Sequence, residues 1–395
     1  MKVKIKEKVS IEPKISPMGF EDINFKNVDH NHQLILNYLV NYSKNNSFKY
    51  INLSSTNKEI IQKLISSYQK TINGKNLLED EYILKGHELF EFDKLEEKNY
   101  LRYLIYRYKY NIFPKLHIVD KYPPHLQIEL SSICNFRCVM CYQSDKSFSS
   151  KSFGHMDMMK YEVFTKIIDE IQDEVEAVTF ASRGEPTLHQ DFSKILKYIN
   201  NKFLAFKLNT NASMLNEKMI HDILSSNMQT LVFSIDSFEK EQYEKIRVNG
   251  NFDKIFRNLE LFTNIKQKEY PNSKLITRVS GVKIKDDQSI DDMKKTWSNY
   301  VDAVAFVPYT PWESSYDNPI NNLSHACHEL WTRLFVWADG RANPCDYDYK
   351  STLSKWNVKF LNVQEIWNSR EYEKLRNYHL NKKRNLLSPC NKCLA

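Results

Sequence analysis

The chain has 395 residues, 42% of them hydrophobic, and a formal net charge of +7. At about 150 residues per domain, this length predicts two or three domains. A run of about 18 apolar residues, which a membrane span would need, does not occur, and the start Met1–Lys8 lacks the apolar core of a secretory signal. We therefore expect a cytoplasmic protein with no membrane partner, whose seven cysteines serve metal or redox chemistry rather than disulfides.

The first part of the chain, residues 1–115, predicts a mainly helical accessory region with a helix near Glu59–Ser66. Its densest basic and aromatic run is 100–110, where Tyr103, Tyr106 and Tyr110 recur at helical spacing. This spacing favours a stripe packed on the next domain over a surface that stacks nucleic-acid bases. Because lysines are spread along the whole chain, the net charge reflects composition, and nucleic acid is not favoured as a partner.

The middle of the chain, residues 121–310, alternates short strand-like runs with longer helical patterns, which indicates a parallel sheet with crossover helices. Six such units predict the α/β class and a partial (β/α)6 TIM-like barrel. Asp157 is the expected cap of the first crossover helix, and ligands are expected beyond the carboxyl ends of the strands. The predicted strands are Leu126–Leu130, Ala177–Phe180, Leu204–Leu208, Leu231–Ile235, Leu275–Val279 and Ala303–Val307.

Three cysteines, Cys134, Cys138 and Cys141, follow the first predicted strand with the spacing CxxxCxxC. Thiolates are the preferred ligands of iron–sulfur clusters, and a 4Fe-4S cluster normally takes four of them. Three thiolates therefore leave one iron open. The alternative is zinc, but zinc sites usually show paired spacings that close four ligands, and this loop has no adjacent histidine.

This motif resembles that of the radical S-adenosylmethionine (SAM) superfamily. The resemblance implies that SAM chelates the open iron and that its reductive cleavage gives a 5'-deoxyadenosyl radical, which abstracts hydrogen from a substrate. Gly184, Glu185 and Pro186, after the second strand, resemble the family's GGEP motif, which receives the amino group of SAM. Met140 stands where an aromatic residue commonly contacts adenine through its backbone, so methionine can substitute there.

Four further residues resemble SAM-site positions or depart from the motif. Arg183 replaces the first glycine, and it can either hold the loop by an ion pair or bind an anionic substrate or the SAM carboxylate. Asn209 follows the third strand, where the family often has short polar side chains. Ser234 and Asp236 resemble the ribose-binding position, although both are also common turn residues. Arg247 resembles an arginine near the SAM carboxylate, and a solvated arginine at a helix end is the alternative.

The remaining cysteines are all C-terminal: Cys327, Cys345, Cys390 and Cys393. With a hairpin at 337–345 built on a two-residue Asp339-Gly340 turn and a helix at 366–376, residues 320–395 resemble the SPASM/twitch extension of radical SAM enzymes. The resemblance implies one auxiliary 4Fe-4S cluster, and a four-thiolate zinc site stays open. Further cysteines beyond Ala395 would make two auxiliary clusters in this extension an alternative again.

If all seven cysteines bind iron, no thiol remains to return hydrogen to a substrate radical. We therefore expect a radical SAM oxidoreductase that oxidises a small carbohydrate-like metabolite by two electrons, with the auxiliary cluster as acceptor and flavodoxin or ferredoxin as reductant. Candidate catalytic or substrate-binding residues are Arg183, His189, Glu313 and Asp346, and the aromatic run 308–313 suits a sugar pocket. The alternatives are modification of a ribosomal peptide and a non-catalytic metal-cluster protein.

Overall fold

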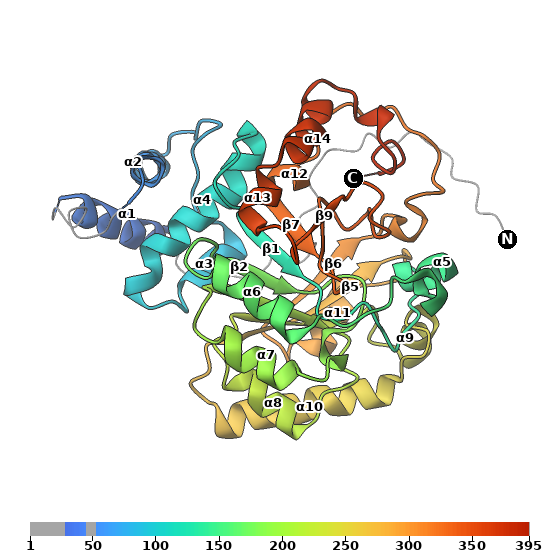
Figure 1. The fold of residues 1–395 in the computed structure, drawn as a ribbon. Coiled ribbons are helices and arrows are strands. Elements are labelled where there is room, and N and C mark those ends of the chain that lie inside the picture. Colours follow the sequence, from blue (N-terminus) through green and yellow to red (C-terminus); the bar gives the residue numbers. More distant parts are fainter. Residues whose placement is uncertain (1–27, 45–52, 395) are drawn as a thin grey trace.

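The computed structural model describes residues 28–44 and 53–394, which form a helical N-terminal region, an α/β barrel and a C-terminal extension (Figure 1). In the described residues, six parallel strands follow one another in chain order around the barrel sheet. The predicted α/β class and partial barrel are therefore confirmed. These strands are β1 (His125–Ile128), β2 (Ala177–Phe180), β3 (Ala205–Thr210), β4 (Thr230–Ser234), β5 (Ile276–Lys283) and β6 (Ala303–Pro308).

Helices cover the outer face of this sheet because alternate strand residues are apolar. Phe180, Leu208 and Phe233 are fully or almost fully buried in one core with the apolar faces of these helices. The first crossover helix is capped at Lys160 rather than at Asp157, so the predicted cap was wrong. The covering helices are α6 (Tyr161–Ile171), α7 (Phe192–Ile199), α8 (Glu217–Leu224), α9 (Lys240–Ile246), α10 (Phe252–Glu269) and α11 (Ile290–Trp297).

The C-terminal extension joins the same sheet. After α12 (Glu329–Thr332), β7 (Arg333–Val336) runs parallel to β1 in the register Leu126 to Leu334. The antiparallel β8 (Arg341–Asn343) and β9 (Trp356–Asn357) continue it, and the described residues form one sheet in the order β6-β5-β4-β3-β2-β1-β7-β8-β9. The hairpin was predicted, but its place beside β1 was not.

Two local predictions in this extension need correction. The hairpin turn holds three residues rather than two, because Trp337 N donates to Arg341 O at 2.8 Å and Gly340 takes the left-handed conformation, with φ 86°. The single helix expected at 366–376 is two helices, α13 (Val363–Trp367) and α14 (Arg370–Leu380). The break occurs where the Ser369 side chain caps the second helix.

The N-terminal helices α1 (Val28–Lys44), α2 (Ser55–Ile72), α3 (Gly86–Phe92) and α4 (Tyr100–Leu116) form a separate core at one side of the barrel (Figure 1). This core reaches the amino ends of β2 and β3 at Ala177 and Ala205, and Arg102 forms a two-bond ion pair with Glu176, 2.8 Å for each bond. The helical region therefore lies at the end of the barrel opposite the cysteine loop. The tyrosine stripe is packed, but Tyr103 and Tyr106 are buried in the core of the N-terminal helices, and it is Tyr110 that contacts the barrel, at the ring of His125 on β1.

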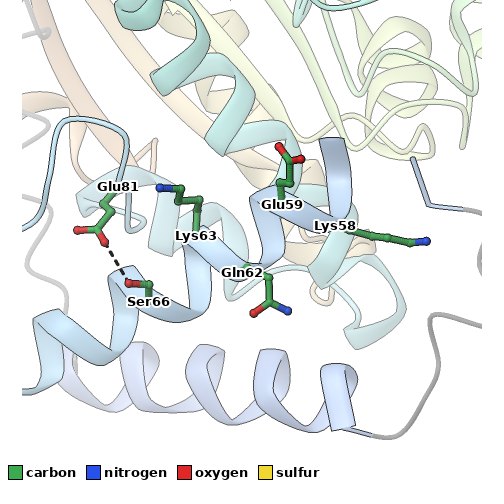
Figure 2. A pocket seen from close by; sticks show the side chains of 6 residues that line it. All are labelled: Lys58, Glu59, Gln62, Lys63, Ser66 and Glu81. Carbon is green, nitrogen blue, oxygen red and sulfur yellow. Dashed lines mark hydrogen bonds between the residues drawn. The ribbon is translucent and has the colours of Figure 1, made fainter. Parts of the chain in front are cut away.

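A surface cavity of about 700 Å³ lies along α2 in this region (Figure 2). It is lined by charged and polar side chains, and Ser66 donates to Glu81 at 3.0 Å across its edge. None of the predicted site residues lines it. In the described part of the chain, no helix is both long and apolar enough to span a bilayer.

Candidate functional site

The first three cysteines lie in a loop directly after β1, which we call the cysteine loop (residues 134–141). Its backbone is fastened to the end of α9, where Arg137 N donates to Val248 O at 2.8 Å and Val139 N to Ile246 O at 3.0 Å. Burial raises the pKa of Cys138 to about 12, and the charge of the neighbouring Cys141 raises it as well. Buried thiolates need a compensating positive group, so the donor set fits a bound metal cluster.

Polar donors surround the sulfur atoms of this loop. Phe136 N donates to Cys134 Sγ at 3.4 Å, and Asn211 Nδ2 lies 3.9 Å from the same sulfur. Arg247 Nη1 lies 3.9 Å from Cys138 Sγ. Hydrogen bonds to ligand sulfurs tune the charge and potential of a cluster. Asn211 belongs to the short polar run that begins at Asn209, but its place beside a cysteine sulfur was not predicted.

Arg247 and Asp236 form a buried ion pair behind the cysteine loop. Arg247 Nε donates to Asp236 Oδ2 at 2.5 Å, and Val282 N donates to Asp236 Oδ1 at 2.7 Å. Asp236 is fully buried and both of its oxygens accept hydrogen bonds within the protein, and the ribose-binding role predicted for it stays a prediction. Asp236 also holds the guanidinium of Arg247 beside the cluster thiol, and Arg247 is buried, which contradicts a solvated helix end. The contact with the SAM carboxylate stays a prediction.

The Gly184-Glu185-Pro186 loop packs directly on the cysteine loop. A side chain at residue 184 would place its Cβ 2.2 Å from Ser131 O, so only glycine fits there. Glu185 N donates to Ile133 O at 3.0 Å, and Pro186 opens a short 3-10 helix. The structure thus brings the two predicted motifs together into one site.

The Glu185 carboxylate lies at the centre of this site. It accepts hydrogen bonds from Thr210 Oγ1 at 2.7 Å, from Asn211 N at 2.7 Å and from Thr187 N at 3.1 Å. Burial raises the pKa of Glu185, and these donors oppose the shift. Its charge also raises the pKa of Cys134, which places the carboxylate beside the first cysteine.

Several polar atoms at the carboxyl ends of the strands have no partner among the described residues. Asn209 Oδ1 and Ser182 Oγ are buried without a hydrogen bond, and Ser182 also adopts a φ of 131°. Buried polar atoms are normally satisfied, so these two fit a ligand that completes them. Ser234 lies half-buried at the end of β4, and Met140 is buried beside the cysteine loop. Ser182 was not selected from the sequence because serine in a loop carries no signal of its own.

Arg183 belongs to the framework rather than to a substrate pocket. Its side chain is 0% exposed, donates to both oxygens of Glu129 at 2.6 and 2.7 Å and to Tyr349 O at 2.7 Å, and lies 4.2 Å from the Trp337 ring centre. Every side of the guanidinium is therefore occupied. Of the two roles left open for it, the ion pair describes the structure and the catalytic one is wrong.

Of the other three candidates, His189 is also wrong as a base. Its Nε2 bonds to Met159 O at 2.8 Å and its Nδ1 accepts from Asp191 N at 3.1 Å, so both ring nitrogens are engaged. Glu313 and Asp346 remain candidates. Burial raises the pKa of Glu313, whose Oε2 has no hydrogen bond among the described residues, and its charge reaches Cys141. Burial raises the pKa of Asp346 to about 6, and the charge of Glu329 adds to that shift.

The four C-terminal cysteines, which we call the C-terminal cysteine group, lie close enough to interact electrostatically. Burial raises the pKa of Cys345, and the charges of Cys390, Cys393 and Cys327 raise it further. Around the group, Cys327 N donates to His379 Nδ1 at 3.2 Å. Within the described residues, no set of three or more His, Cys, Asp or Glu side chains is spaced to hold a single metal ion.

Comparison with known families assigns both cysteine groups. Residues 128–295 match the radical SAM superfamily, and residues 327–394 match an iron-sulfur cluster-binding domain, SPASM. The first match contains the cysteine loop and the Gly-Glu-Pro motif, and the second contains all four C-terminal cysteines.

Curated relatives match part of this chain over part of their own length. A tungsten-containing aldehyde ferredoxin oxidoreductase cofactor-modifying protein of Pyrococcus furiosus is 30% identical over 28% of this chain and 30% of its own length. A GTP 3',8-cyclase of Clostridium botulinum is 26% identical over 47% of this chain and 56% of its own. The chain thus spans little more than half of the second relative and less than a third of the first.

Among solved structures, SuiB of Streptococcus suis bound to S-adenosylmethionine is similar in fold, with a TM-score of 0.50 and 15% identity. The similarity covers 91% of this chain and 87% of SuiB. Together, the two domains are built to hold a SAM-bound 4Fe-4S cluster and an auxiliary iron–sulfur cluster. Residues 128–295 therefore form a radical SAM domain, and residues 327–394 form a SPASM-type iron–sulfur cluster-binding domain.

Proposed function

We propose that this protein is an oxidoreductase that removes two electrons from a C–H bond of a small, carbohydrate-like metabolite. The observation that carries the proposal is the division of all seven cysteines into a group of three and a group of four. No cysteine is left to return a hydrogen atom to a substrate radical. The C-terminal cysteine group instead offers ligands for an electron acceptor. The strands of its extension continue the sheet of the barrel.

In this proposal Cys134, Cys138 and Cys141 hold the SAM-binding cluster. When bound there, the cluster with SAM supplies a 5'-deoxyadenosyl radical, which removes a hydrogen atom from the substrate. Glu185 would accept the amino group of SAM, and its raised pKa falls when that cation arrives. The remaining cofactor contacts would come from the backbone at Gly184, Pro186 and Met140 and from the side chains of Asn209, Ser234 and Ser182.

The C-terminal cysteine group would hold the auxiliary 4Fe-4S cluster. Its thiols interact electrostatically, and they all lie in the part of the chain that matches an iron-sulfur cluster-binding domain. This match favours a cluster over zinc. The surrounding backbone and ring donors, such as the contact of Cys327 N with His379, would keep the ligands in place.

Oxidation also requires a base for the proton that leaves with the second electron. Glu313 is the better-placed candidate, because Tyr309 holds one carboxylate oxygen while the other has no hydrogen bond among the described residues. Its raised pKa suits a group that takes up a proton. The rings of Tyr309 and Trp312, 5.8 Å apart, could form the apolar side of a sugar pocket. Asp346, with a pKa of about 6, is the second candidate.

Modification of a ribosomal peptide is the alternative function, and the relatives do not distinguish it from oxidation of a small metabolite. The names of the relatives point to a nucleotide for one, the GTP cyclase, and one structure of SuiB contains a precursor peptide. A small molecule is favoured because the described residues before β1 are helical and lie at the amino ends of the strands. They show no strand that could pair with an extended peptide.

The test is anaerobic reconstitution with iron and sulfide, followed by assay of SAM cleavage with dithionite, flavodoxin or ferredoxin. About eight irons are expected per chain, and about four each in Cys134→Ala/Cys138→Ala/Cys141→Ala and in Cys390→Ala/Cys393→Ala. Only the second variant should still release 5'-deoxyadenosine, and it should not form a product two hydrogens lighter than the substrate. A Cys138→Ala protein that cleaves SAM normally would overturn the proposal, as would oxidation without the auxiliary cluster.

A further inference from the structure

The inner face of the barrel carries three cations. Lys207 on β3, Arg278 on β5 and Arg333 on β7 alternate with residues that pack outward in the helix-covered core, among them Leu208, Val279 and Leu334. Because successive side chains of a strand point to opposite faces, these three point into the barrel interior. None of the three is fully buried, unlike the apolar residues that alternate with them.

Lys207 differs from the other charges of this interior. Among the described residues, its ammonium has no hydrogen bond and no ion pair. Glu91, the carboxylate whose charge reaches Lys207, is already engaged, since it binds Arg107 and accepts from Tyr103 at 2.6 Å. Burial, followed by repulsion from Arg278 and Arg333, lowers the pKa of Lys207 to about 7. Glu91 attracts Lys207 only from a distance, and an enclosed cation without an ion-pair partner is costly to keep in a folded protein.

The same strand leads from Lys207 to the cluster site. Lys207, Asn209 and Asn211 follow at intervals of two residues, so their side chains share one face of β3 and its continuation. Asn209 Oδ1 has no partner in the described chain, and Asn211 reaches Cys134 Sγ at 3.9 Å. At about 3.3 Å per residue, the line from Lys207 to Asn211 is roughly 13 Å long. A ligand of sugar-phosphate or nucleotide size would span it.

We propose that Lys207, supported by Arg278 and Arg333, binds an anionic oxygen group of the substrate inside the barrel. The substrate is then a small phosphorylated or carboxylated metabolite whose anionic end lies at Lys207 and whose reacting carbon lies toward the cysteine loop. This rests on the proposed function, because it places the substrate of that reaction. Arginine forks and a lysine ammonium are the usual partners of phosphate and carboxylate.

The first test measures binding without turnover, using inorganic pyrophosphate and malonate as probes on the reconstituted protein. Pyrophosphate or malonate should raise the thermal midpoint of the wild type. A larger shift with pyrophosphate indicates that the substrate carries a phosphate, and a larger shift with malonate indicates a carboxylate. Lys207→Met should lose this shift, Lys207→Arg should keep part of it, and Lys197→Met, an exposed lysine on α7, should keep all of it. Equal shifts in the wild type and in Lys207→Met, or no shift with either probe, would overturn the proposal.

Stability without a probe gives an independent readout. Lys207→Met should unfold at a higher temperature than the wild type, because it removes an enclosed charge that only a ligand neutralises. A purely structural lysine would give the opposite result. A lower midpoint for Lys207→Met than for the wild type therefore counts against a ligand-binding role.

A turnover experiment separates this proposal from the proposed function. Among phosphorylated, carboxylated and neutral compounds, the anionic ones should stimulate 5'-deoxyadenosine formation, and Lys207→Met should raise their KM about 10- to 100-fold with a smaller change in kcat. Pyrophosphate binding through Lys207 without stimulated SAM cleavage would sink the oxidation and leave the anion site. Equal turnover of a neutral polyol by the wild type and Lys207→Met would overturn the anion site and leave the proposed oxidation standing.

Discussion

Arg183 and Lys207 are two enclosed cations of the same barrel, and their surroundings are opposite. Arg183 meets both oxygens of Glu129, a backbone carbonyl and the face of Trp337, whereas Lys207 meets no partner among the described residues and has arginines nearby. The first arrangement is complete without a ligand. The second becomes balanced only when an anion enters. Satisfaction of a buried charge, rather than burial itself, thus separates framework from binding site.

The largest loss of stability is expected when the buried ion pair of Arg183 and Glu129 is broken. Arg183→Met leaves Glu129 buried without its counter-charge and should lower the free energy of unfolding by about 3–5 kcal/mol. Anaerobic urea denaturation of the reconstituted protein measures it. Adding Glu129→Gln should recover much of the loss. If Arg183→Met were as stable as the wild type, the framework role of this pair would be wrong.

Removing the charge of Lys207 should raise the free energy of unfolding, in contrast to Arg183→Met, and the size of this effect should depend on pH. The groups facing it are Arg278 on β5, Arg333 on β7, His125 on β1, Glu91 on α3 and Arg107 on α4. Its pKa is about 7 when folded and about 10.4 in an unfolded chain. Between these values the unfolded state binds more protons, so the contribution of Lys207 to stability rises with pH.

Relative to Lys207→Met, the wild type should therefore be least stable below pH 7, by a few kcal/mol at most, and should draw level as the pH approaches about 10. Thermal unfolding of both proteins across this range measures the difference. Lys197→Met is the control and should follow the wild type at every pH. A constant difference between Lys207→Met and the wild type would show that Lys207 is charged in both states throughout.

Substitution of Asn209 tests the role of an uncharged buried group that has no hydrogen bond among the described residues. Asn209→Ala removes a buried oxygen that has no partner among the described residues, so the stability without ligand should change by less than about 1 kcal/mol. Binding of SAM or substrate should weaken by about tenfold. Equilibrium binding of SAM and the KM for substrate distinguish the two ligands. A loss of stability with unchanged binding of both would place Asn209 in the framework.

The smallest effect is expected at Arg102. Its pair with Glu176 is a two-bond ion pair like that of Arg183, but the arginine side chain is 47% exposed. Exposed pairs contribute about 0–1 kcal/mol, so Arg102→Met should change the free energy of unfolding by no more than that. Urea denaturation in parallel with Arg183→Met gives the comparison. A loss as large as that of Arg183→Met would mean that the joint with the N-terminal helices depends on this pair.

The sequence predicted the parts of the site that lie close together along the chain. Cys134, Cys138 and Cys141 share one loop, and the Gly184–Pro186 motif follows the next strand. The ion pairs could not be foreseen, because Arg183 meets Glu129 54 residues away and Arg247 meets Asp236 from beyond α9. His189 looked like a base because neither of its hydrogen bonds, to Met159 O and Asp191 N, can be read from the pattern.

Two further features were hidden for physical reasons. An antiparallel hairpin has the same alternation whether or not its first strand pairs with another sheet, so the place of β7 beside β1 could not be inferred from 333–345. Lys207 carried a readable signal, since a lysine between Phe206 and Leu208 in a barrel strand must face the interior. Only the structure shows that arginines of two other strands face the same interior.

The pairing of β7 with β1 makes the C-terminal extension a piece of the barrel wall. A chain that stopped before Arg333 would leave the polar backbone edge of β1 unpaired and would uncover its apolar face, a combination that invites association with other chains. The extension therefore does more than carry the C-terminal cysteine group, because its first strand also protects the edge of the strand that leads into the cysteine loop.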